Sequence, residues 1–184
     1  YNAEGRLASV TDFSGRTVTY AYVRNDLDLS GDIGDLKAVT SPPVIGTPNG
    51  NDFPAGKTIT YTYTRGFADD RLNHNLLSAR DGGGRLLQEF TYSPVTNAAD
   101  IEFDMCDSVN RDRVILSGNV TLCKFEIPPS VPGSPVAYRC ILNDPVGRVT
   151  EIDYDAHHRE IACREYTGFA APGVVTTSSS NRPN

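Results

Sequence analysis

Residues 15–22 read GRTVTYAY and residues 56–63 read GKTITYTY, and these two stretches decide the fold. In each, a glycine and a basic residue precede a run of threonine, valine or isoleucine, and tyrosine. Branched and aromatic side chains pack well on a pleated surface, so both runs favour strands. Large and small side chains alternate, which puts Val18, Tyr20 and Tyr22 on one face. Helical periodicity of any length is absent, and the sequence predicts an all-β chain.

The glycine and basic residue belong to a repeat, Asp-x-x-Gly-Arg, that begins at Asp12, Asp81 and Asp144, with a degenerate copy at Gly56. A tyrosine follows each glycine after seven or eight residues. Because aspartate accepts hydrogen bonds from backbone N–H groups and glycine takes positive φ, each motif predicts a tight turn of a β-hairpin. The residues that define the repeat are Asp12, Gly15, Arg16, Tyr20, Tyr22, Gly56, Tyr61, Tyr63, Asp81, Gly84, Arg85, Tyr92, Asp144, Gly147, Arg148 and Tyr154.

One hairpin cannot bury its own apolar face, so we expect stacked antiparallel hairpins. The predicted organisation is hairpins over 1–92 with an inserted loop around 41–56, an irregular region with one hairpin over 93–136, a further repeat over 137–175, and a Ser-rich linker or tail over 176–184. In the irregular region, residues 114–116 and 120–125 are rich in branched apolar side chains and flank Ser117-Gly118-Asn119, which predicts the hairpin there.

Composition excludes several classes of function. The net charge is −6, which argues against a nucleic-acid binder. No apolar run approaches the length needed to span a bilayer. The sequence opens within the repeat pattern and not on a recognisable leader peptide, so we expect it to be a piece of a longer protein.

The four cysteines, Cys106, Cys123, Cys140 and Cys163, all lie in the second half of the chain. No CxxC pair or Cys/His cluster is present, which argues against a structural zinc site. An even number of cysteines is compatible with two disulfides in an oxidising compartment, in any of three pairings, and equally with four buried thiols.

An acidic stretch suggests a metal site. Asp26, Asp28, Ser30 and Asp32 place oxygen atoms at alternate positions around Gly31, as a calcium loop requires. Against calcium, the twelfth position holds Lys37 where a bidentate glutamate is expected. The alternative is a solvated acidic loop between hairpins. Calcium is the only cofactor that the sequence suggests.

Catalytic signatures are absent, and we expect no enzyme. His157 and His158 lie beside Asp153 and Asp155, but neighbouring strand residues point to opposite faces, so a surface turn is the better interpretation of this cluster. The recurrent tyrosines could stack on sugar rings. Their fixed distance from the turns instead favours a layer that holds the sheet together.

Residues 1–12, YNAEGRLASVTD, resemble the YD repeat of the Rhs family, and residues 154–159, YDAHHR, echo its opening. This family includes bacterial Rhs toxins, shell components of insecticidal toxin complexes, and teneurins. The resemblance implies a strip of β-sheet that spirals into a hollow shell, with tyrosines stacked along it. In the toxins the shell encloses a C-terminal effector, and in teneurins it presents an adhesive surface.

Two departures from the family matter. The chain holds four or five repeats, which is too few to close a cavity alone. Residues 143–147, NDPVG, are similar to the Asp-Pro core of the family's self-cleaving segment, but they align with the repeat turns at Asp12 and Asp81, and we interpret them as a turn.

We therefore expect a non-catalytic structural segment of a large secreted or cell-surface protein. It would pack against neighbouring repeats, or other segments of the same protein, in a shell that encloses or displays another part of the chain, such as a toxin effector. The alternative is an extracellular adhesion module that binds carbohydrate or a protein on a partner cell.

Overall fold

A computed structural model describes residues 1–111, 120–129 and 131–174. In these ranges the chain is all-β, as predicted: eleven antiparallel strands form one open sheet in sequence order, and the one helical element is a 3-10 turn, η1. No helix in the described ranges is long and apolar enough to cross a membrane. The elements are β1 Ser9–Thr11, β2 Thr17–Tyr22, β3 Leu36–Thr40, β4 Thr58–Tyr63, η1 Asp70–Leu72, β5 Leu76–Asp81, β6 Leu86–Tyr92, β7 Cys106–Asn110, β8 Val120–Glu126, β9 Tyr138–Asn143, β10 Arg148–Tyr154 and β11 Glu160–Phe169.

The chain divides into two compact units, Tyr1–Glu89 and Phe90–Asn184. Strand β6 crosses the division, so β5 pairs with its first part in the first unit. The second unit contains the end of β6 and strands β7 to β11.

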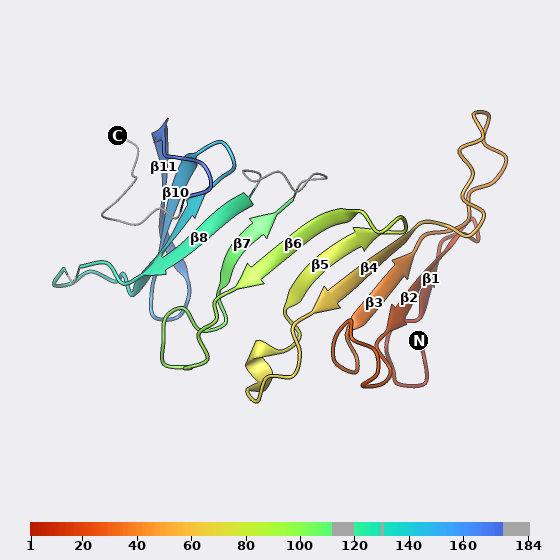
Figure 1. Cartoon of the computed structure of the whole chain (residues 1–184), viewed down its shortest axis with the longest axis horizontal. Coiled ribbons are helices and arrows are strands. Elements are labelled where there is room, and N and C mark those ends of the chain that lie inside the picture. The colour runs from red at the N-terminus through yellow and green to blue at the C-terminus, as the bar shows by residue number, and fades with distance from the viewer. Residues whose placement is uncertain (112–119, 130, 175–184) are drawn as a thin grey trace. The chain divides into compact units, whose positions relative to one another are not determined.

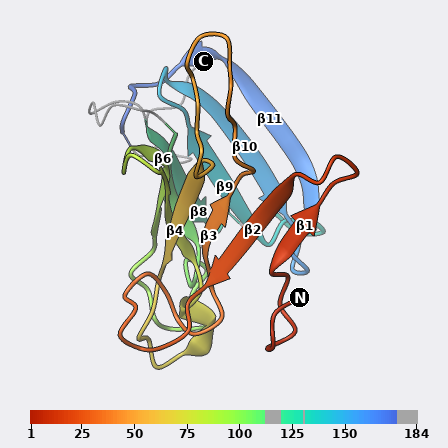
Figure 2. The same cartoon turned by 90° about the vertical axis from the view of Figure 1, so that its right-hand side faces the viewer.

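Connections in the first unit alternate between the two ends of the strands (Figure 1). Turns 12–16, 41–57 and 81–85 lie at one end, and loops 23–35 and 64–75 lie at the other. Segment 41–57 projects beyond the ends of β3 and β4 in both views (Figures 1 and 2).

Each unit has a thin core, because the described residues contain no second sheet or α-helix to cover a sheet face. Along β2, the small residues Thr19 and Ala21 are exposed while Val18, Tyr20 and Tyr22 are only half-buried, with the alternation expected. The buried apolar residues are Val23, Leu72, Ala79 and Leu86 in the first unit, and Tyr138, Cys140, Ile141, Val149 and Ala170 in the second.

Part of the hairpin predicted near residue 120 can be compared with the structure. Its second strand, residues 120–125, lies within β8, which pairs with β7. The first predicted strand at 114–116, the turn at 117–119 and the tail at 176–184 lie outside the described residues.

Candidate functional site

The Asp-x-x-Gly-Arg motif forms the same turn wherever it occurs. At Asp12, one carboxylate oxygen accepts the N–H groups of Ser14 at 2.8 Å and Arg16 at 3.0 Å, and the other accepts the Arg16 side chain at 2.8 Å. Gly15 has a φ of 79°, which an L-residue adopts only with strain. The side-chain hydrogen bond from Arg16 lowers the pKa of Asp12, so the turn favours the ionised carboxylate.

The turns at Asp81 and Asp144 repeat the hydrogen bonds from backbone N–H groups to the aspartate. Arg85 N–H donates to Asp81 at 3.0 Å, and Arg148 N–H donates to Asp144 at 2.8 Å. The backbone hydrogen bond from Arg85 is the main reason that the pKa of Asp81 is lowered. The segment at 144–147 is therefore a repeat turn, in agreement with its alignment.

A turn of this kind also forms where the glycine is missing. Asp155 accepts the N–H groups of His157 and Arg159, and His158 takes the glycine position with a φ of 59°. A hydrogen bond of 2.8 Å between Tyr138 Oη and His158 Nδ1 holds the imidazole. The side-chain hydrogen bond from Arg159 lowers the pKa of Asp155 to about 2. The Asp-to-Arg spacing was the available sequence signal for this turn.

The inserted loop interrupts a repeat turn without destroying it. Ser41 N–H donates to Lys57 O at 2.9 Å, and Lys57 N–H donates to Ser41 Oγ at 2.9 Å. Asp12 and Arg16 make the same two contacts across their turn. Serine thus replaces the aspartate, and residues 42–55 are an insertion between it and Gly56.

The repeat tyrosines mainly hold strands together. Tyr22 Oη donates to Leu7 O at 2.9 Å, and Tyr63 Oη donates to Leu36 O at 3.0 Å. The same hydrogen bond thus forms in both repeats. Burial raises the pKa of Tyr63. In the second unit, the ring of Tyr154 stacks on that of Tyr138 with centroids 5.0 Å apart. These contacts support the structural interpretation of the tyrosine layer.

Tyr92 lies eight residues after its glycine because β6 contains one extra residue. Ala79 pairs with Gln88 but Arg80 pairs with Leu86, so Leu87 has no partner in the register. This β-bulge accounts for the longer spacing.

The acidic loop does not leave an open cluster of carboxylates. Lys37 Nζ lies 2.6 Å from Asp28 Oδ2, and this hydrogen bond is the main cause that lowers the pKa of Asp28 to about 2. Arg65 donates to the backbone carbonyl oxygen of Asp28 at 2.6 Å and to that of Asp26 at 3.3 Å, and it lies 3.8 Å from the Asp32 carboxylate.

Two cationic side chains, those of Lys37 and Arg65, therefore contact the oxygen atoms that were expected to bind calcium. Ser30 Oγ donates to the Asp28 carboxylate at 2.6 Å. Across the described ranges, no three His, Cys, Asp or Glu side chains are grouped to hold a metal ion. Of the two adjacent histidines, His158 has its ring against Tyr138.

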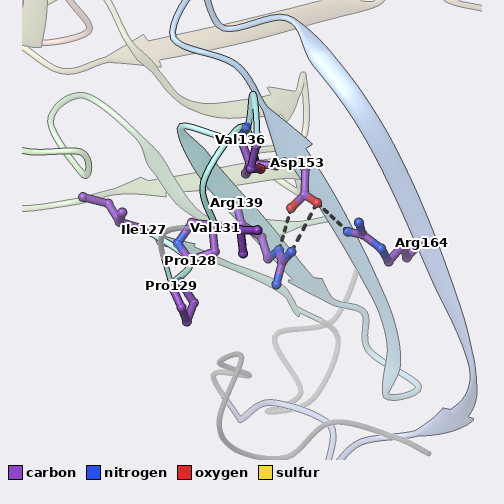
Figure 3. Close-up of a pocket in the computed structure, with 9 residues that line it drawn as sticks. Ile127, Pro128, Pro129, Val131, Val136, Arg139, Asp153 and Arg164 are labelled. Carbon is purple, nitrogen blue, oxygen red and sulfur yellow. Dashed lines mark hydrogen bonds and ion pairs between the residues drawn. The ribbon is translucent and has the colours of Figure 1, made fainter.

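A pocket of about 500 Å³ lies in the second unit, between residues 127–129 and 131–136 on one side and the strands β9 to β11 on the other (Figure 3). Arg139 and Arg164 approach the Asp153 carboxylate from either side, at 2.6 Å and 2.5 Å. Glu151, two residues before Asp153 and therefore on the same face of β10, lies 3.6 Å from Arg139. The apolar wall of the pocket is formed by the side chains of Ile127, Pro128, Pro129, Val131 and Val136.

This network is suited to structure rather than to proton transfer. Burial raises the pKa of Asp153, but hydrogen bonds from Arg139 and Arg164 outweigh it, so the pKa lies below its ordinary value. Both carboxylate oxygens accept guanidinium hydrogen bonds, and Asp153 is 1% exposed. An ionised carboxylate held in this way is a poor general base. Sequence alone gives no sign of this ion-pair network, because its residues lie on three different strands.

Comparison of the chain with models of protein families and with curated proteins finds no match.

Proposed function

We propose that this chain is a non-catalytic segment of the wall of a YD-repeat β-shell in a secreted or cell-surface protein. The observation that carries the proposal is the single-layer sheet, whose hairpins follow one another in sequence order. The same turn recurs in the hairpins that contain the Asp-x-x-Gly-Arg motif. Such a sheet has half-exposed faces and two terminal strands, β1 and β11. Neighbouring repeats, or another part of the same protein, would cover these surfaces.

The terminal strands support the proposal. Each has one described neighbour in the sheet, and each exposes an apolar side chain, Val10 at 48% and Ile161 at 40%. An unprotected edge strand pairs readily with a further strand. In a continuous wall that further strand belongs to the next repeat.

Sedimentation of the 184-residue chain over a wide concentration range tests the proposal. A wall segment without its neighbours is expected to self-associate and to unfold over a broad temperature range. The variant V10K/I161K places a charge on both edges and should reduce association. Leu27→Lys, at a 90% exposed position in loop 23–35, is the matched control and should leave association unchanged.

A monomer at all concentrations with one sharp unfolding transition would overturn the wall proposal. That result would favour the adhesion module, which must fold alone, and glycan or cell-surface binding would then be tested.

A further inference from the structure

The pocket of the second unit offers positive charge to a ligand, although its network contains carboxylates. Of the three charged residues that line it, Arg139 and Arg164 are cationic and Asp153 is anionic. Asp153 and Glu151 are buried, and both oxygens of Asp153 already accept guanidinium hydrogen bonds. The Arg164 side chain, in contrast, is 48% exposed. A molecule in the pocket therefore meets N–H donors, because the carboxylates lie out of its reach.

The two arginines are held by Asp153 in different ways (Figure 3). Arg139 donates from Nε at 2.6 Å and from Nη2 at 3.2 Å, so its fork of two N–H groups is already used. Arg164 donates to Asp153 only from Nη1, at 2.5 Å. Within the part of the chain that the structure describes, the Nε and Nη2 groups of Arg164 have no acceptor.

This second fork is suited to a carboxylate. Two parallel N–H groups of a guanidinium match the two oxygens of a carboxylate, which is the geometry of bidentate recognition. Because the buried Asp153 holds the Arg164 guanidinium by its third nitrogen, the fork is oriented before a ligand arrives. Less conformational freedom is then lost on binding.

The opposite wall of the pocket is apolar. It includes Val136 and the largely exposed side chains of Ile127 and Val131. An apolar group placed against this wall would be removed from water together with the wall, which favours binding. The volume of about 500 Å³ falls within the range of roughly 300–1,000 Å³ that is usual for small-molecule sites.

We propose that this pocket binds a small organic carboxylate that carries an apolar body. The carboxylate accepts two hydrogen bonds from Nε and Nη2 of Arg164, and the apolar body lies against Val131 and Val136. A cationic molecule would be repelled by the guanidinium groups. The inference depends only on the second unit, so it does not require the chain to be a shell wall.

NMR titration of the full chain with phenylbutyrate tests this inference. We expect saturable shifts in the backbone signals of residues 127–129 and 131–136 and in the Arg164 Nε–H signal. Phenylbutyramide has the same apolar body without the charge and should bind at least about tenfold more weakly. Acetate has the carboxylate without the apolar body and should also bind more weakly than phenylbutyrate.

Substitutions of Arg164 separate the fork from the charge. Arg164→Met removes both and should weaken phenylbutyrate binding by at least about tenfold. Arg164→Lys keeps a cation beside Asp153 but has no fork. It should also weaken binding, and it provides the test if the methionine variant does not fold. Arg24→Met removes the same charge at an exposed position of the first unit and should leave the affinity unchanged.

Four results would contradict the proposal. They are equal affinity for phenylbutyrate and its amide, full affinity in Arg164→Lys, shifts confined to residues outside the pocket, and no saturable binding up to the solubility limit of phenylbutyrate.

Discussion

The two units use the same hairpin and the same turn but are stabilised by different parts of their structure. In the first unit, loops 23–35 and 64–75 are held by cationic side chains, and the strands bury few residues. In the second unit, a buried ion-pair network and stacked tyrosines lie on the strands themselves. The repeat therefore specifies the hairpin, while the stability of each copy depends on residues outside the repeat.

The largest expected effect is that of removing the buried carboxylate in the second unit. Asp153→Asn leaves Arg139, whose side chain is 15% exposed, without its closest anionic partner. Breaking a buried pair in this way should cost about 3 kcal/mol of unfolding free energy. Urea unfolding combined with amide hydrogen exchange should show the loss in residues 138–169. Asp81→Asn, in a solvent-exposed turn, is the control, and a similar loss in both variants would remove the distinction between the units.

Alanine at two equivalent turn glycines compares the units directly. At Gly147, with a φ of 89°, an added Cβ would lie 2.2 Å from Ala170 O, whereas at Gly15, with a φ of 79°, it would meet open space. Gly15→Ala should therefore cost only backbone strain, about 1 kcal/mol, and Gly147→Ala at least about 2 kcal/mol. Chemical denaturation measures the unfolding free energy of both variants. Equal losses of free energy would show that the surroundings of the turn do not affect the cost of the substitution.

Arg65 tests how much the loops contribute to the first unit. Arg65→Met removes two hydrogen bonds to backbone carbonyls of loop 23–35 and should cost about 1–2 kcal/mol. Hydrogen exchange should become faster in residues 26–32. Arg71→Met is the control, because Arg71 bonds to Asp69 within its own short turn. Unchanged exchange in residues 26–32 would contradict this account.

A smaller, pH-dependent effect is expected at His74. Its Nδ1 lies 2.8 Å from Asp35 Oδ1, and this hydrogen bond raises the pKa of the imidazole. Since protonated His74 is favoured in the folded state, its stabilising contribution is complete below the ordinary histidine pKa, about 6.5, and is lost as pH rises through the higher folded value. NMR titration of His74 should show the raised pKa. His74→Gln should remove this part of the pH dependence of unfolding, and an unshifted titration would refute the contact.

The smallest expected effect is that of calcium. Lys37 and Arg65 already surround the acidic loop, so millimolar calcium should leave the melting temperature unchanged. A ligand that binds the folded state must raise that temperature, so a clear rise would support calcium binding by this loop.

The turns and the strand faces could be predicted because their causes are local. The spacing of Asp12, Gly15 and Arg16 is sufficient to define a turn, and alternation is sufficient to define a face. The arrangement of Arg139, Asp153 and Arg164 could not be predicted, because it depends on which strands become neighbours and in which register.

The insertion at residues 42–55 shows that the turn tolerates a long interruption. Two hydrogen bonds between Ser41 and Lys57 persist across it, one between backbone groups and one from the Lys57 N–H group to the Ser41 hydroxyl, and β3 and β4 keep their pairing. Lengthening a loop between fixed ends adds little entropic cost. The repeat turns are therefore suitable attachment points, where a foreign peptide or a small folded module can be grafted while the strands on either side remain in register.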